Sequence, residues 1–357
     1  MVKLTTVKRQ HLPAHDFQKL LPALLQTQCF FFSSNISFHD KARYSIFAYF
    51  PQNITTVESG LVTENDHTCI MAPFDAIDHL ECLAGNFHKD AYLPFSGGLI
   101  GCINYHTLLE AKACSVTPYK TQRFPDVWCA LFDGVFLYDH LEEECVFSSQ
   151  GWNGTSFDEK LSIERVTQLQ NMLHTFNEIK HNDEREKNYT PILSLRLQSI
   201  IEKLSRYEKT FRTYGAKLPT LVQHKTLPLT NSVQTQISQT LKTDAKSTGL
   251  ILDHVAFAAP ASHQLYSTKP IVDMLSSLCN TASYNLVQAE VIRSLETVSR
   301  ELYGGFSFLS DGRSSRAFPL GEHYLFSPTE QTQLCSFETH ELLSSEKELS
   351  FPSLLSF

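Results

Sequence analysis

The sequence lacks the features that mark several large classes of protein. It contains no apolar run long enough to span a membrane, and its opening, Met1-Val-Lys-Leu-Thr-Thr, leads into Lys8-Arg9 without the apolar core of a signal peptide. Basic residues are not clustered among aromatic ones, and 30 Lys and Arg against 38 Asp and Glu give a net charge of −8. That balance disfavours nucleic-acid binding. We therefore expect a cytoplasmic protein that binds neither nucleic acid nor a membrane.

Paired cysteine motifs are also missing. The chain has nine cysteines, an odd number, but no Cys-x-x-Cys pair and no paired histidines beside a cysteine. Neither a disulfide framework nor a zinc site is favoured, so we expect reduced, buried thiols. No Lys-Ser/Thr follows Gly97-Gly98, which excludes a phosphate-binding loop there.

Short apolar runs separated by turn residues are what the chain does have. Residues 30–32, 44–50 and 127–137 predict strands, with Asp133-Gly134 as a bulge or tight turn in the last of them. Gly97-Gly98 ahead of Leu99 indicates a strand that another backbone approaches closely. These strands do not alternate regularly with helices, so the pattern predicts an α+β fold and disfavours a parallel sheet.

Helical patterns begin in the middle of the chain. Apolar residues at helical spacing predict amphipathic helices over 157–179 and 193–211. A turn-rich segment at 148–155 indicates a boundary, and the charged residues 181–188 indicate a solvated linker. We therefore divide the chain into residues 1–150, a helix with a charged linker over 151–190, and residues 191–357.

Four motifs recur in one known family. They are Leu295-Glu-Thr-Val-Ser-Arg-Glu-Leu-Tyr-Gly-Gly305, Cys29-Phe-Phe-Phe-Ser-Ser34 followed by Arg43-Tyr-Ser45, Leu93-Pro-Phe-Ser-Gly-Gly98, and Pro125-Asp126 followed by Asp139-His140. Together they resemble segments of the chorismate-utilising enzymes, which include anthranilate synthase component I, aminodeoxychorismate synthase component I, isochorismate synthase and salicylate synthase. The order and spacing of the matches hold over residues 28–150.

The resemblance implies a fold and a division of labour. It implies two facing antiparallel sheets with helices packed outside, and a C-terminal half that is trimmed relative to the family. Residues 1–150 would form a domain like the N-terminal domain of anthranilate synthase component I. Residues 191–357 would form a degenerate chorismate-binding-like domain.

The catalytic residues that the resemblance implies are depleted. Ser247 stands where the family has a Mg²⁺-binding Glu, and Asn231 replaces a Gly of the substrate loop. Replacing Glu by Ser removes both charge and metal ligand. We therefore predict no metal site and a catalytically impaired protein of folate or aromatic amino acid metabolism, a pseudoenzyme that acts as a binding or partner protein. The alternative is an active, Mg²⁺-dependent synthase that aminates chorismate to aminodeoxychorismate or anthranilate, with ammonia from a glutamine amidotransferase subunit.

Part of the substrate site is retained in the sequence. The resemblance places Arg300, Tyr303, Gly305, Glu296 and Thr230 around the substrate. Arginine offers a two-pronged donor and tyrosine a hydroxyl, so this remnant is expected to bind a small carboxylate weakly. The alternative is that Arg300 ends its helix and Tyr303 fills the core.

A second candidate site lies in the first third of the chain. The resemblance implies a pocket for an amino acid such as tryptophan, to which Ser33, Ser34, Arg43 and Ser45 would contribute. The alternative is that these residues cap strands and a buried loop.

Overall fold

A computed structural model of the chain describes residues 5–26, 28–34, 43–65, 67–90, 92–110, 123–176, 222–229, 231–243, 246–261, 264–279, 299–321 and 323–338. The helices are α1 (Ala14–Leu24), α2 (Pro73–Ala84), α3 (Tyr105–Glu110), α4 (Glu159–Phe176), α6 (Val233–Thr243) and α7 (Ile271–Cys279). The strands are β1 (Thr6–His11), β2 (Cys29–Ser34), β3 (Tyr44–Glu58), β4 (Leu61–Glu64), β5 (His67–Ile70), β6 (Gly98–Ile103), β7 (Val127–Asp139), β8 (Glu144–Ser149), β9 (Val222–Pro228), β10 (Lys246–Ile251), β11 (Ala256–Pro260), β12 (Leu265–Ser267), β13 (Phe306–Ser310), β14 (Ser315–Pro319), β15 (His323–Ser327) and β16 (Thr332–Glu338).

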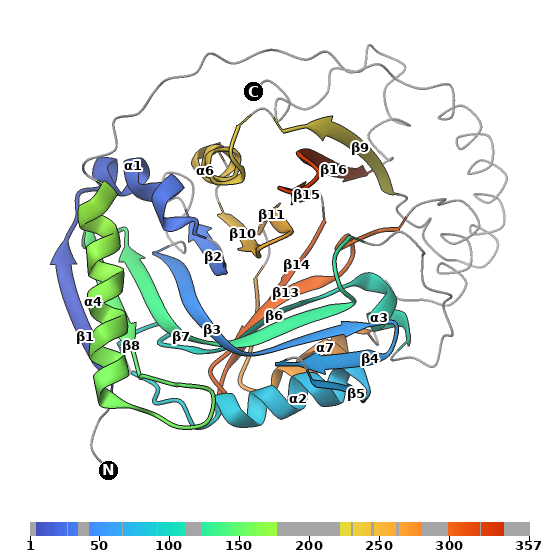
Figure 1. The fold of residues 1–357 in the computed structure, drawn as a ribbon, viewed down its shortest axis with the longest axis horizontal. Coiled ribbons are helices and arrows are strands. Elements are labelled where there is room, and N and C mark those ends of the chain that lie inside the picture. The colour runs from blue at the N-terminus through green and yellow to red at the C-terminus, as the bar shows by residue number, and fades with distance from the viewer. Residues whose placement is uncertain are drawn as a thin grey trace, which may run out of the picture.

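All described strands join one antiparallel sheet of 16 strands (Figure 1). Its main path runs β12-β14-β13-β6-β7-β3-β2-β10-β11-β15-β16-β9, with β8 and β1 continuing from β7 and with β4 and β5 continuing from β3. The predicted antiparallel α+β fold is confirmed. The two facing layers are hydrogen-bonded parts of a single sheet, which curls between β3 and β2 so that its halves face each other.

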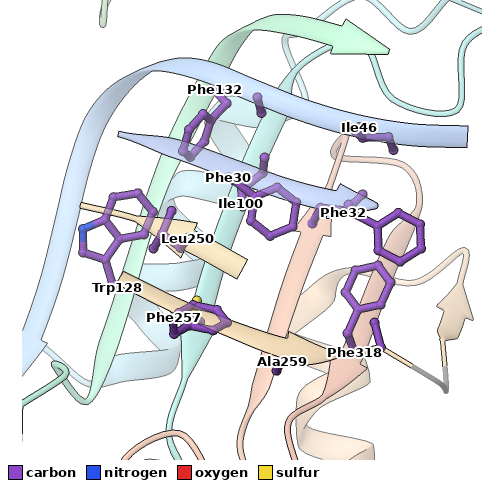
Figure 2. Close-up of a cluster of buried hydrophobic side chains, with 14 of the residues drawn as sticks. Phe30, Phe32, Ile46, Ile100, Trp128, Phe132, Leu250, Phe257, Ala259 and Phe318 are labelled. Carbon is purple, nitrogen blue, oxygen red and sulfur yellow. The ribbon is translucent and has the colours of Figure 1, made fainter. Parts of the chain in front are cut away.

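The inner face of the sheet forms the core between the two halves. We call it the inner core, and the close-up in Figure 2 shows side chains from both halves meeting there. Phe32 of β2 stacks on Phe318 of β14 with 4.8 Å between ring centroids, although the two strands are far apart in the sheet order. Fully burying one phenylalanine contributes about 1.5–3 kcal/mol, so this face stabilises the curl strongly.

Helices cover the outer face of each half. Helices α2, α3 and α7 pack on the outer side of β6, β7 and β13, whereas α1, α4 and α6 pack farther along the same outer face, over β2, β3, β8 and β10. In Figure 1, α2 and α7 lie together below the sheet and α1 and α4 lie at its left end. None of the helices in the described parts of the chain is long and apolar enough to cross a membrane.

Strand β7 is buried on both faces along its whole length. Trp128 and Phe132 face the inner core, but beyond Asp133-Gly134 the odd-numbered Val135 and Leu137 face it instead. The alternation of sides therefore shifts at Asp133-Gly134, where an irregularity was predicted. A Cβ on Gly134 would lie 2.4 Å from the ring of Phe50, so glycine leaves room for that ring.

Other local predictions were also correct. The predicted helix over 157–179 is α4, and the predicted one over 193–211 lies outside the described residues. Gly98 begins β6 with φ of 141°, and a Cβ there would lie 2.4 Å from the carbonyl oxygen of Ser310. The close approach of another backbone is thus confirmed.

The division of the chain at residues 150 and 190 stays a prediction. Strands from both sides of this division are neighbours in the sheet, as the pairing of β13 with β6 shows.

A buried ion pair fixes helix α4 to the irregular point in β7. The Asp133 carboxylate is fully buried and accepts hydrogen bonds from Arg165 Nη1 at 2.6 Å, Ser149 Oγ at 2.5 Å and the N–H of Gln150 at 2.9 Å. Arg165 also donates to the carbonyl oxygen of Trp152 at 2.6 Å. The carboxylate therefore ties β7 to the β8–α4 connection.

Removing one partner of this pair should be strongly destabilising. Asp133→Ala or Arg165→Ala should each lower the free energy of unfolding by about 3–5 kcal/mol, because the remaining charge stays buried without its partner. Denaturant unfolding of both single variants and the double variant would measure this. If the two residues are coupled, the double variant should lose clearly less free energy of unfolding than the sum of the two single losses. Additive losses would refute the coupling.

Candidate functional site

The first candidate site is the segment Ser299–Gly305, directly before β13. Arg300 is 4% exposed, and its guanidinium carbon lies 4.7 Å from the ring centroid of Tyr105 and 5.7 Å from that of Tyr303. Tyr303 is itself buried. Arg300 and Tyr303 are thus brought together, as predicted, but inside the packed structure.

Two glycines shape this segment. Gly304 has φ of 80°, which favours glycine, and its N–H donates to the carbonyl oxygen of Leu320 at 2.7 Å. A Cβ on Gly305 would lie 2.1 Å from the carbonyl oxygen of Ile103, so only glycine fits against β6. The burial of Arg300 and the role of Gly305 favour the packing alternative for this segment, and weak carboxylate binding stays a prediction. The other two predicted members, Glu296 and Thr230, lie outside the described residues.

Glu301 is the residue of this segment that the sequence analysis did not single out. Its buried carboxylate accepts hydrogen bonds from the N–H groups of Arg123 at 3.0 Å and Phe124 at 3.2 Å. Burial raises its pKa to about 7, although both N–H groups and the charge of Arg123 act to lower it. Its position inside the motif next to Arg300 was visible in the sequence, but its burial was not.

The second candidate site is a surface pocket on the inner side of β1, β8, β7 and β3. The pocket has a volume of about 530 Å³, and its lining includes Leu93, Leu137 and Val146, which also belong to the inner core. Its remaining lining residues are Arg9, His11, Arg43, Tyr44, Tyr92, Asp139, Glu142 and Glu144. We call it the Arg43 pocket.

Ion pairs hold both arginines of this pocket. Arg43 donates to Asp139 from Nε at 2.8 Å and from Nη2 at 2.6 Å, and Arg9 Nη1 lies 2.7 Å from Glu144 Oε2. Burial raises the pKa of Asp139, but hydrogen bonds from Arg43 and from the backbone outweigh it and the net pKa is lowered. Both arginines therefore lie at the pocket wall in ion pairs with carboxylates.

The predicted amino-acid residues are not all in this pocket. Ser45 is fully buried, and its Oγ lies 2.7 Å from His140 Nε2 and 3.4 Å from Ser33 Oγ. Successive strand residues point to opposite faces, so Ser45 is directed away from its pocket-lining neighbour Tyr44. Of the four candidates, Arg43 lines the pocket, and Ser33 and Ser45 form a separate buried chain. Nothing is described of the side chain of Ser34.

The residues that we can describe do not fit a magnesium ion. Ser247, where the resemblance implies a ligand carboxylate, is a buried residue of β10, paired with Ser33 of β2 and Pro260 of β11. Across the described ranges, no group of three or more His, Cys, Asp and Glu side chains is arranged to hold a metal ion. Glu341, Glu346 and Glu348, the acidic residues after β16, lie outside those ranges.

Comparisons with known proteins support the fold. No protein-family model matches the chain, and no curated protein matches its sequence. Among solved structures, it is similar to anthranilate synthase component I from Streptococcus pneumoniae TIGR4, with a TM-score of 0.62 and 13% identity over 84% of this chain and 87% of that chain. It is also similar to MenF, the menaquinone-specific isochorismate synthase from Escherichia coli, with a TM-score of 0.47 and 9% identity over 93% of this chain and 88% of that one. The chain therefore has the fold of anthranilate synthase component I, and the likeness at 13% identity shows the fold alone.

Replacing Arg300 tests whether it supports the structure. Arg300→Ala should lower the free energy of unfolding by about 2–4 kcal/mol, because a buried cation stacked on two aromatic rings is lost. Arg313→Ala, which changes an exposed arginine, is the control and should be close to neutral. Titration of benzoate into the same proteins adds a ligand test. Millimolar binding to the wild type but not to Arg300→Ala would instead support the predicted carboxylate site.

Glu301 should make stability depend on pH. Folding raises its pKa from 4.5 to about 7, so between these pH values the folded state binds more protons than the unfolded state. The contribution of Glu301 to the free energy of unfolding therefore falls as the pH rises through 7. Glu301→Gln should remove this dependence, which can reach about 3 kcal/mol, because the amide oxygen still accepts the N–H groups but does not titrate. Unfolding curves at pH 5 and 7.5 for Glu301→Gln and the exposed control Glu58→Gln would measure it. Equal pH dependence in both variants would contradict the assignment.

Proposed function

We propose that this chain is a diverged, non-catalytic relative of the component I enzymes of chorismate metabolism, and that it acts by binding a small zwitterionic ligand, such as an amino acid, in the Arg43 pocket. The observation that carries the proposal is the pocket itself. It combines two ion-paired guanidinium groups, nearby carboxylates and an apolar floor.

The state of the remnant substrate site supports the absence of catalysis. The Arg300 guanidinium is buried against Tyr105 and Tyr303, and Glu301 is held by backbone N–H groups. A catalytic group must reach the reacting atoms. Ser247 offers a hydroxyl in place of the carboxylate that the chemistry implied by the resemblance would need for a metal ion.

The pocket lining indicates the chemistry of the ligand. A carboxylate can bind the N–H groups of Arg9 and Arg43 that their ion pairs leave unused, and an ammonium group can bind Glu142 and Glu144. Leu93, Leu137 and Val146 provide apolar surface for a side chain. The mixture of both charge signs beside an apolar floor suits a zwitterion better than a simple anion.

Binding should depend on Arg43. Titration of the purified protein with each of the common amino acids, followed by calorimetry, should find at least one that binds. Arg43→Ala should weaken it by roughly tenfold to a hundredfold, the effect of losing a charge-assisted hydrogen bond. Arg313→Ala should leave the affinity unchanged. If no amino acid binds, or if Arg43→Ala binds equally well, the ligand assignment is wrong.

Catalysis is tested separately from binding. Chorismate, Mg²⁺ and an ammonium salt are mixed with the protein, so that no glutamine amidotransferase subunit is needed to supply ammonia. We expect no aminated, fluorescent product. Turnover above a protein-free control would overturn the non-catalytic proposal and favour the alternative, an aminodeoxychorismate or anthranilate synthase that would pair with such a subunit.

A further inference from the structure

Two histidines and a serine form a row across three neighbouring strands. His323 of β15 is paired with Ser336 of β16, and Ser336 is paired in turn with His224 of β9. Leu325 and Leu334, which lie two residues from His323 and Ser336 along these strands, belong to the inner core. The row therefore points toward the interior between the two halves of the sheet.

Hydrogen-bond contacts run through the row from one carbonyl group to another. His224 Nε2 lies 2.5 Å from the carbonyl oxygen of Ser299, and His224 Nδ1 lies 2.8 Å from Ser336 Oγ. Ser336 Oγ lies 3.2 Å from His323 Nε2, and His323 Nδ1 lies 2.9 Å from the carbonyl oxygen of Gly321. At its His224 end, the row thus reaches the segment that leads into β13, in the other half of the sheet.

The number of protons does not match the number of contacts. Each of the four contacts needs one hydrogen, and both carbonyl oxygens can only accept. Two neutral imidazole rings and one hydroxyl supply three hydrogens. One contact therefore lacks a hydrogen when both rings are neutral, and the longest, between Ser336 and His323, tolerates this best.

We propose that the His224–Ser336–His323 row is a single-proton switch, in which a proton taken up by His323 completes a continuous hydrogen-bonded row from the carbonyl oxygen of Ser299 to that of Gly321. In the neutral row, His224 carries its hydrogen on Nε2 and His323 carries its hydrogen on Nδ1. The added proton is placed on His323 Nε2 and is donated to Ser336. The switch does not depend on ligand binding or catalysis.

The surroundings set the pH range of the switch. Burial lowers the pKa of His323 to about 4, and the bond to Gly321 opposes this while His224 adds to it. Burial also lowers the pKa of His224, and the charges of Arg123 and Arg300 lower it further, against the bond to Ser299. Glu301 binds the backbone at Arg123, and Glu330 lies 3.5 Å from the Arg123 side chain. A second proton in the row is disfavoured, because both rings contact the same hydroxyl and the charges of Arg123 and Arg300 act on His224.

The direction of the pH effect follows from the lowered pKa. The stabilisation that comes from neutral His323 is fully present above pH 6.5 and is lost as the pH falls through 4. The completed contact to Ser336 offsets part of that loss. Removing the Ser336 hydroxyl therefore costs its hydrogen bond to His224 at neutral pH, and in acid also the one from charged His323.

The hydrogen positions can be measured by long-range ¹H–¹⁵N spectra of the imidazole rings. His224→Gln and His323→Gln assign the signals. At pH 7.5 the wild type should show the Nε2–H tautomer for His224 and the Nδ1–H tautomer for His323, and acidification should charge His323 alone. The opposite tautomer at either ring, or charging of both rings above pH 4, would overturn the proposal. This measurement stands even if a serine variant fails to fold.

A matched pair of serine variants tests the link itself. Ser336→Ala should be more destabilising at pH 3, where His323 is mostly charged, than at pH 7.5, whereas Ser238→Ala should cost the same at both. Ser238 is equally buried, and it donates to the carbonyl oxygen of Thr235 at 2.8 Å within α6. Equal destabilisation by Ser336→Ala at the two pH values would refute the switch and leave the amino-acid and catalysis tests unaffected.

Discussion

The structure depends on one constraint, which is that the central strands must bury both of their faces. All 13 residues of β7 are buried, and apolar side chains project from both of its sides. A flat sheet covered on one side by helices would leave half of these side chains in water. The sheet therefore curls until its inner face packs on itself, and helices cover the two outer faces.

The curl determines where polar chemistry can occur. The segment Ser299–Gly305 enters the packed region between β6 and the strands of the other half, so Arg300 is buried and its guanidinium stacks on aromatic rings. The Arg43 pocket lies where the inner core ends at β1 and β8, and there charged side chains meet an apolar floor. The segment that carries Arg300 and Tyr303 is thus part of the core, while the Arg43 pocket is open at the edge of the core.

Much of the fold could be predicted from local patterns. The apolar runs of β2, β3 and β7, the helical spacing of α4 and the glycine at the start of β6 each indicate their structure through neighbouring residues. The resemblance to the chorismate-utilising enzymes added the facing layers. Sequence patterns could not show that the layers are one hydrogen-bonded sheet, because β2 joins β10 across more than 200 residues of chain.

The sequence by itself determined the types of β2, β3, β6, β7 and α4 and favoured the antiparallel α+β class, and the resemblance grouped Arg300 with Tyr303. Only the tertiary structure decided which polar residues share a site. Ser45 and Tyr44 are adjacent in the chain, yet opposite faces of β3 separate them. His224 and Ser336 are 112 residues apart, yet strand pairing places them side by side. The physical reason is register: a shift of one residue moves every side chain of a strand to the other face, and register between distant strands is fixed only when the core packs.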